Sequence, residues 1–108
     1  MVNKKILGLM GLATRARKIA FGADSVEIEI KSKKVKLILV AEDASDRTKE
    51  KFQKLSEKFD IPIIITGTIE EISKAIGKSN KAIVGVKEEN LAKEILKINN
   101  GGEFIGEN

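Results

Sequence analysis

The chain has 108 residues, of which 42% are hydrophobic and 33% charged, so its length fits one domain and its composition excludes a disordered chain. The absence of cysteine and histidine excludes disulfides, thiol nucleophiles, the usual zinc ligands and the commonest general base. We therefore expect neither enzymatic activity nor a cofactor. Residues 1–58 hold 14 Lys and Arg against 8 Asp and Glu, whereas residues 59–108 hold 6 against 8. This asymmetry indicates either a polyanionic partner for the N-terminal half or a solvated, lysine-rich surface.

The first expected element is a helix over residues 3–16, where Ile6, Leu7, Met10 and Ala13 recur at helical spacing. Its basic start and apolar stretch resemble a signal peptide, but the basic residues TRARK follow in place of a cleavage site. No apolar run approaches the length of about 18 residues that a membrane span needs. We therefore expect a cytoplasmic protein with no membrane partner.

Residues 24–31, DSVEIEIK, fit two structures. Their strict alternation matches a strand, and the pattern alone favours that interpretation. As a helix, the segment would turn Val26 and Ile30 inward and Ile28 outward, because Ile28 lies about 200° round from Val26.

The second half of the chain alternates strands with helices. Short, almost wholly apolar runs predict strands at residues 35–41, 61–66 and 82–86. Helical spacing and capping residues predict a helix from Ser45 or Asp46, a short helix from a Thr68–Glu71 capping box to Gly77, and a helix over residues 88–98. The expected core stripes of these helices are Phe52, Leu55 and Phe59; Ile69, Ile72 and Ile76; and Leu91, Ile95 and Ile98.

This alternation predicts an α/β fold, a three-layer α–β–α sandwich around a small, mostly parallel sheet. Residues 1–100 are expected to form this single domain, and residues 101–108 a flexible C-terminal tail.

Two segments resemble catalytic or nucleotide sites. Glu42 and Asp43 follow a predicted parallel strand, a position that often carries function, although an Asp there more often caps the following helix. Gly77, Lys78 and Ser79 match the end of a phosphate-binding P-loop, but that loop needs a glycine where Ile72 stands and must start a helix, whereas this run ends one. We expect a small basic loop there and no nucleotide site.

Two stretches carry a family resemblance, GLATRARKIAFGADSV at residues 11–26 and KLILVAEDASDRTKEK at residues 36–51. They resemble the kink-turn-binding ribosomal protein superfamily of the L-seven-Ae type, most closely its small bacterial YlxQ-type branch. The resemblance covers roughly residues 6–98 without a gap, with further matches at Pro62, Gly77, Lys78 and the segment Leu91, Ala92 and Lys93.

We expect the sheet to be mixed, with about four strands. The resemblance implies an α–β–α sandwich, a helix over residues 22–32, and binding to kinked RNA with tandem sheared G·A pairs. For residues 22–32 we follow the resemblance against the alternating pattern. The RNA-binding residues it implies lie in the first basic stretch, at the start of this helix, beyond the second strand and in the loop before the last strand: Lys18, Gly22, Asp24, Ser25, Ile28, Ser45, Lys49, Lys78, Ser79 and Asn80.

Three of these residues depart from the family pattern. Asp24 and Ser25 stand where the family typically has Asn-Glu reading guanine edges, and Ile28 stands where many members have Lys. Asp cannot donate the hydrogen bonds of Asn, Ser is too short to mimic Glu, and Ile removes a cation. Alternatively, Asp24 or Ser25 only caps the helix while Ile28 packs on a neighbour.

We therefore expect a non-catalytic, ribosomal-protein-like factor that binds kink-turn, ribosomal or riboswitch RNA, with ribosome-associated proteins as further partners. The four Phe fall mostly on core stripes, which favours recognition of folded RNA over stacking on single strands. The alternative is a protein-interaction adaptor that keeps the fold and uses an exposed Ile28. We also expect a contiguous positive face next to Gly22, formed by Arg15, Arg17, Lys18, Lys31, Lys33, Lys34 and Lys36.

Overall fold

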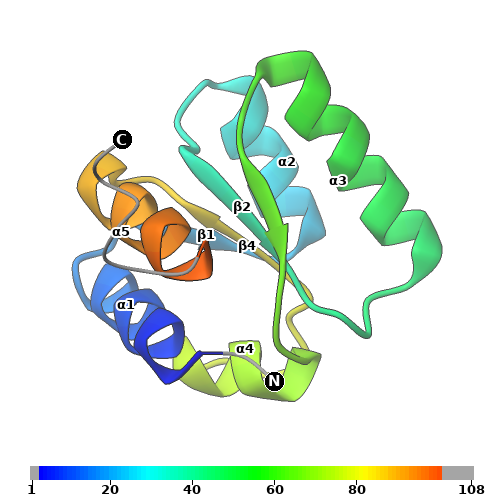
Figure 1. The fold of residues 1–108 in the computed structure, drawn as a ribbon. Coiled ribbons are helices and arrows are strands. Elements are labelled where there is room, and N and C mark those ends of the chain that lie inside the picture. Colours follow the sequence, from blue (N-terminus) through cyan, green and yellow to red (C-terminus); the bar gives the residue numbers. More distant parts are fainter. Residues whose placement is uncertain (1–2, 101–108) are drawn as a thin grey trace.

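The computed structural model describes residues 3–100 and shows helices packed around a small sheet (Figure 1). The elements in chain order are α1 (Lys4–Arg15), β1 (Ile19–Phe21), α2 (Ala23–Lys31), β2 (Leu37–Val40), α3 (Asp46–Phe59), β3 (Ile63–Ile65), α4 (Ile69–Ala75), β4 (Ile83–Val86) and α5 (Glu89–Asn99). The expected tail at residues 101–108 lies outside the described residues. Within residues 3–100, none of the helices combines the length and apolar character that crossing a bilayer requires.

The four strands form one mixed sheet in the order β1-β4-β2-β3. β2 pairs with β3 in parallel, whereas β4 runs antiparallel to both β1 and β2. Three strands therefore share one direction, but β4 lies between two of them and makes two of the three pairings antiparallel. The α/β fold and mixed sheet are confirmed, and the expectation of mostly parallel pairing is wrong.

The direction of β4 follows from the connection that precedes it. The loop after α4 brings the chain back to the edge at which β2 ends, where the N–H of Ala41 donates to the carbonyl oxygen of Ala82 at 2.9 Å. Alternating strands and helices in a sequence do not reveal such a return, because the pattern is the same for either strand direction.

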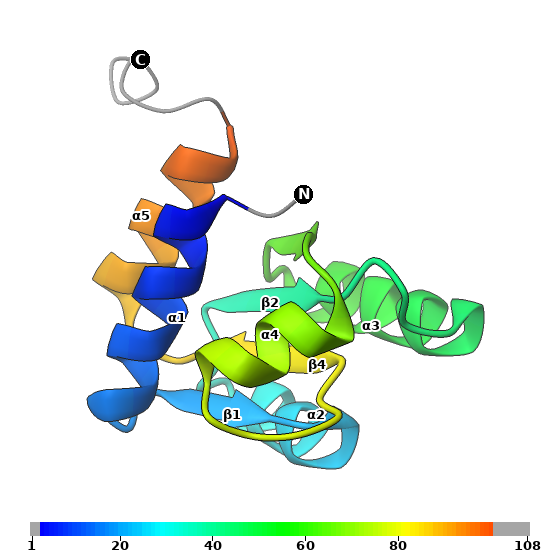
Figure 2. The same ribbon diagram turned by 90° about the horizontal axis from the view of Figure 1, so that it is seen from below.

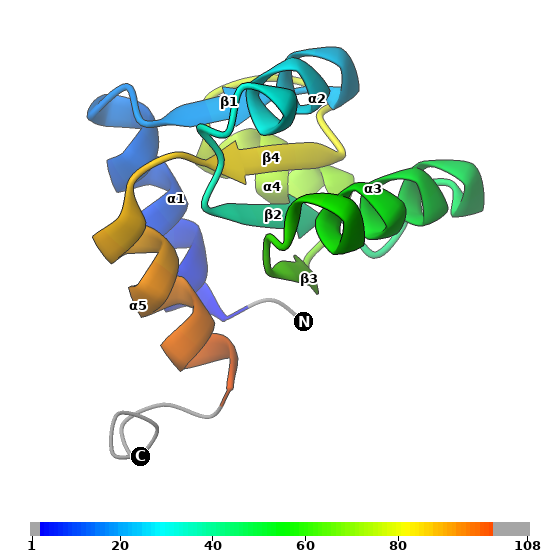
Figure 3. The same ribbon diagram turned by 90° about the horizontal axis from the view of Figure 1, so that it is seen from above.

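The helices cover the two faces of the sheet. α2 and α3 lie on one face and α4 on the other, and α1 packs against both α4 and α5 (Figures 2 and 3). The predicted core stripes are confirmed: Phe52, Leu55, Ile72, Ile76 and Ile95 are buried, and Phe59, Ile69, Leu91 and Ile98 are partly buried against them.

The segment with the alternating pattern is helix α2, as the family resemblance implied, and the strand interpretation is wrong. Val26 and Ile30 are fully buried, whereas Ile28 is 62% exposed. Gly85 of β4 permits this packing, since a Cβ there would lie only 3.3 Å from a methyl carbon of Val26. The 3.1 Å ion pair between Glu27 and Lys31, one turn apart, further supports the helix.

Strand β1 was not predicted from the pattern, because its three residues are too few to establish a period. It nevertheless supplies the fourth strand of the expected sheet. It also sets the position of α2, which begins directly after it.

Local hydrogen bonds confirm the predicted helix starts. Ser45 accepts from the N–H of Thr48 at 3.1 Å, and Thr68 and Glu71 form the reciprocal capping box at the start of α4. Asp43 is also a capping residue, but of a different helix from the one expected. Its carboxylate accepts from the N–H of Ile69 at 2.8 Å, so it caps α4 and not the α3 helix that follows it in sequence.

Candidate functional site

One edge of the sheet brings together segments that are far apart in sequence. β1, β2 and β3 end there and β4 begins there, because β4 runs opposite to its neighbours. We call residues 22–28, 41–49 and 77–82 the site edge. The N–H of Gly22 donates to the carbonyl of Ile83 at 2.9 Å, and the N–H of Glu42 donates to the carbonyl of Gly67 at 2.7 Å. Nine of the ten predicted site residues lie on this edge, and Lys18 does not.

Gly22 is the N-cap of α2 and has φ 89° and ψ 147°. This conformation is essentially restricted to glycine. Among residues 3–100, no side chain forms a capping hydrogen bond at this helix start, so the first N–H groups of α2 are open to a ligand. A Cβ at Gly22 would lie 3.9 Å from the ammonium nitrogen of Lys81 and would meet nothing closer. The glycine is therefore required by the backbone and not by crowding.

Asp24, Ser25 and Ile28 are exposed and lie one turn apart on α2. Positions three and four apart share a helix face, so the three side chains form one surface. The alternative, in which Asp24 or Ser25 caps the helix and Ile28 packs on a neighbour, is wrong, because no side chain caps α2 and Ile28 is exposed.

The loop before β4 is fixed by a buried serine. The hydroxyl of Ser73 accepts from the N–H of Lys81 at 2.7 Å and donates to its carbonyl at 3.2 Å. Asn80 has a left-handed φ of 56°, which Asn tolerates better than most residues. Lys78, Ser79 and Asn80 are all exposed. The loop therefore holds three polar side chains in solvent on a well-anchored backbone.

Phe21 and Lys81 belong to this site and were missed at the sequence level. The ammonium groups of Lys78 and Lys81 lie 4.9 Å and 5.6 Å from the centre of the Phe21 ring. A cation over an aromatic face is attracted to it, so the partly buried ring holds two lysines beside Gly22. The position of Phe21 directly before Gly22 was the one sequence feature that could have indicated its role. It became interpretable only when β1 was recognised.

Ser45 is the N-cap of α3, and Lys49 lies at the end of the first turn of this helix. The hydroxyl of Ser45 accepts from the N–H of Thr48 and donates to the Thr48 hydroxyl at 2.9 Å, so most of its hydrogen-bonding capacity is used within the helix. Lys49 is partly exposed and lies one turn further along.

An ion pair joins the two helices that flank the site edge. The carboxylate of Glu27 on α2 lies 2.7 Å from the ammonium of Lys51 on α3. Hydrogen bonds from Lys51 and then Lys31 hold the pKa of Glu27 below its ordinary value, and the bond to Glu27 raises the pKa of Lys51. The pair therefore fixes α2 relative to α3.

The predicted positive face next to Gly22 is wrong. Arg17 and Lys18 precede β1, and Lys33, Lys34 and Lys36 precede β2, so all five lie at the opposite edge of the sheet. The site edge instead mixes Arg47, Lys49, Lys78 and Lys81 with the carboxylates of Asp24, Glu42, Asp43 and Asp46. The two edges could not be separated at the level of the sequence pattern, because the pattern did not reveal β1.

The sequence model of the ribosomal protein L7Ae/L30e/S12e/Gadd45 family matches residues 4–96. The chain belongs to this family. It is 33% identical over 99 residues to RNA-binding protein YlxQ of Enterococcus faecium, covering 92% of this chain and 95% of the relative. It is 32% identical over 90 residues to RNA-binding protein YlxQ of Bacillus subtilis (strain 168), covering 83% and 90%.

Solved structures of this family's fold superpose on the chain. A protein of unknown function from Bacillus halodurans C gives a TM-score of 0.87 at 28% identity, covering 91% of this chain and 99% of that one. The 15.5kD RNA binding protein of Giardia lamblia gives a TM-score of 0.75 at 19% identity, covering 89% and 88%. The second likeness supports the L7Ae-like fold alone.

Proposed function

We propose that this L7Ae-family chain is a non-catalytic factor that binds structured RNA of the kink-turn type through its site edge. The observation that carries the proposal is the convergence of Gly22 to Ile28, Ser45 to Lys49 and Lys78 to Asn80 on one edge. Membership of the family and the relatives named RNA-binding protein support the RNA class of ligand. Ribosomal or riboswitch RNA in the cytoplasm, with ribosome-associated proteins nearby, is the setting we propose.

The chemistry of the site edge suits a folded RNA. Lys78 and Lys81, held over Phe21, supply cations for phosphates, and Gly22 lets a sugar–phosphate backbone approach the start of α2. Asp24 and Ser25 reach only a short way from the helix, and the Asp24 carboxylate repels phosphates. We therefore expect recognition of the kinked shape with modest discrimination between bases.

The test is a comparison of two RNAs. One carries a kink-turn with tandem sheared G·A pairs, and the other has these pairs replaced by Watson–Crick pairs so that the helix stays straight. We expect tighter binding to the kinked RNA, with a salt dependence that follows about 4–6 phosphate contacts, a log–log slope of about −4 to −5. Equal binding to both RNAs would contradict kink recognition. Absence of RNA binding with a salt-independent protein partner would favour the adaptor function, for which the exposed Ile28 is the candidate contact.

A further inference from the structure

The edge of the sheet opposite the site edge gathers cationic side chains around one hollow. The hollow has a volume of about 360 Å³ and is lined by Arg17, Lys18, Lys33, Lys34, Lys36 and Lys87, which we call the basic edge. Three separate connections contribute, those before β1, before β2 and after β4. The cations therefore come together through the fold and not through one run of sequence.

Within the described part of the chain, most of these charges have no ion-pair partner. Among residues 3–100, Lys87 is the member of the basic edge that forms an ion pair, with Glu29 at 3.4 Å. The other five are exposed. Two further carboxylates, Asp60 and Glu89, line neighbouring hollows that share Lys36 with the basic edge. So many exposed cations close together repel one another unless an anion binds between them.

Two of the cations occupy positions where glycine is the usual residue. Arg17 and Lys33 have left-handed φ values of 59° and 62°, directly after the C-caps of α1 and α2. In both turns the N–H of the following residue donates to a carbonyl in the last turns of the helix. Lys18 donates to Ala13 at 2.8 Å, and Lys34 donates to Glu29 at 3.0 Å. Glycine adopts this left-handed conformation after a helix without strain, whereas a residue with a Cβ is strained in it.

The helix dipoles do not account for this choice. A cation near a helix C-terminus is stabilised by the dipole, but Arg15 and Lys31 already occupy the last turns of α1 and α2. Arg17 and Lys33 are additional charges, placed where they make the backbone less stable. Strain that a fold retains at a charged surface residue points to a use for that side chain.

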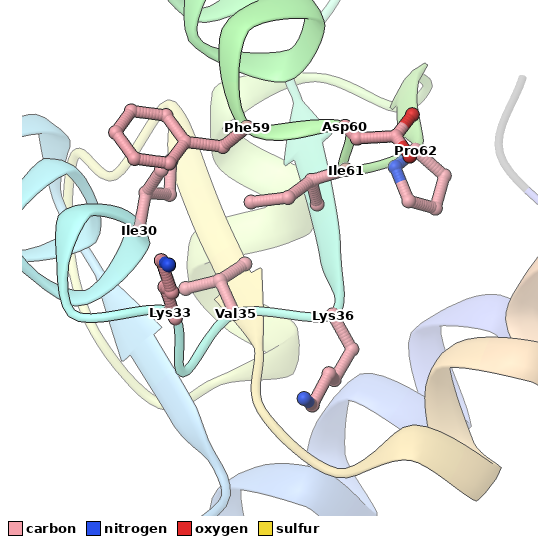
Figure 4. Close-up of a pocket in the computed structure, with 8 residues that line it drawn as sticks. All are labelled: Ile30, Lys33, Val35, Lys36, Phe59, Asp60, Ile61 and Pro62. Atoms are coloured by element: carbon pink, nitrogen blue, oxygen red, sulfur yellow. The ribbon is translucent and has the colours of Figure 1, made fainter.

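The backbone beneath the cations is firmly held. Lys36 donates from its N–H to the carbonyl of Val86 at 2.7 Å, and Lys87 donates to that of Lys18 at 2.7 Å. Val35, 4% exposed, anchors the segment between Lys34 and Lys36. Figure 4 shows the adjoining hollow, in which Lys36 points away from the Phe59 ring. The lysine stems therefore project from a rigid base.

We propose that the basic edge is a second RNA site, which binds backbone phosphates of a segment next to the one held at the site edge. This inference rests on the proposed function. The lining side chains are all cations, which bind phosphates through charge irrespective of sequence. The molecule measures 34 × 28 × 27 Å, so one folded RNA can contact both edges. Once one edge has bound the RNA, the effective concentration of RNA phosphates at the other edge is high, so the two contacts together bind more tightly than either alone.

The test compares a short kink-turn RNA with the same RNA after each stem has been lengthened by about 12 base pairs, to provide phosphates beyond the site edge. The key variant is Arg17→Gly/Lys33→Gly, which removes two cations and keeps both left-handed turns. Arg17→Asn/Lys33→Asn is a second version, since Asn also tolerates this conformation. Lys4→Gln/Lys5→Gln, at the other end of α1, is the charge-matched control.

We expect the wild type and the control variant to bind the long RNA about tenfold more tightly than the short one. The glycine variant should bind the short RNA as the wild type does and lose the advantage of the long one. Its salt slope on the long RNA should be shallower by about 1.5–2, corresponding to two lost phosphate contacts.

Three results would overturn the second site. The glycine and asparagine variants could still bind the long RNA more tightly than the short one, or the control variant could lose as much affinity for the long RNA as they do. The third result is that the glycine variant loses as much affinity for the short RNA as for the long one. Unchanged RNA binding together with loss of an acidic protein partner would assign the edge to protein instead. A failure of the proposed function gives a different result: the wild type would bind the short kinked RNA and its Watson–Crick version equally well.

Discussion

The backbone N–H of Gly22 donates a 2.9 Å hydrogen bond to the carbonyl oxygen of Ile83, which joins the end of β1 to the start of β4. This bond places the N-terminus of α2 beside the loop of Lys78 to Lys81. The bond extends the β1–β4 pairing beyond the register pair of Phe21 and Val84, and the extended, positive-φ conformation of Gly22 then leads the chain into α2.

We predict that Gly22→Ala destabilises the protein by about 1–3 kcal/mol, because alanine resists φ 89° even though its Cβ has room. Thermal or urea unfolding measures the change. Gly8→Ala is the matched control: Gly8 lies within helix α1 with nothing near its missing Cβ, so alanine should stabilise by about 0.5–1 kcal/mol. Equal effects at the two positions would show that the conformation of Gly22 is not required.

Ser45 permits a separation of its structural and binding roles. Ser45→Ala should cost about 1 kcal/mol, since it removes the cap on the N–H of Thr48. Ser45→Asp should keep the cap and the stability but weaken RNA binding, because it adds a negative charge at the site edge. Unfolding and RNA titration of both variants check this. If Ser45→Asp binds RNA as the wild type does, Ser45 lies outside the RNA contact.

The face of Asp24, Ser25 and Ile28 gives a gain-of-function prediction. Asp24→Asn, Ser25→Glu and Ile28→Lys together restore an amide donor, a guanine-edge acceptor and a phosphate cation on one exposed helix face. The triple variant should bind kink-turn RNA at least about tenfold more tightly, on the scale of one good bidentate base contact. It should also discriminate better against the Watson–Crick version. A titration showing no gain in either property would place the RNA away from this face.

Glu27 and Lys51 make stability depend on pH. Because the pKa of Glu27 is lowered in the folded state, its ion pair stabilises at neutral pH and is lost as the pH falls through that lowered pKa. Lys51, whose pKa is raised, loses its contribution only as the pH rises through the raised value. Glu27→Gln should therefore lower the melting temperature at pH 7, and the gap should close as the pH falls through the lowered pKa of Glu27.

The control for this prediction is Glu50→Gln. Its 3.7 Å pair with Lys54 is well exposed and should contribute little at any pH. A melting-temperature gap for Glu27→Gln that stays the same at acid pH would mean that packing, and not charge, is responsible.

The sequence predicted the second half of the fold well, because strong local signals occur there. The apolar runs of the strands, the Thr68–Glu71 box and Gly77 each determine structure within a few residues. At residues 24–31 the local signal was misleading. Val26 and Ile30 fit the buried face of a helix as well as that of a strand, and Ile28 completed the alternation although it is exposed. Their structure depends on the space above Gly85, a contact distant in sequence.

The candidate site was predicted in part for the same reason. The resemblance identified the segments that meet at the site edge, but the pattern alone gave no indication of β1. Without that strand, Phe21 was assigned no role, and Arg17, Lys18 and Lys33 appeared to lie next to Gly22. Strand direction separates these cations from the site edge, and strand direction is a property of the whole sheet.

The most direct test of the RNA interface is an NMR titration that follows the backbone amide signals while kink-turn RNA is added. The proposal predicts that the largest shifts fall on residues 22–28, 45–49 and 78–81, and that the Watson–Crick RNA produces much smaller ones. Shifts confined to other surfaces, such as the outer face of α5, or equal shifts with both RNAs, would contradict the assignment of the site edge as the kink-turn interface.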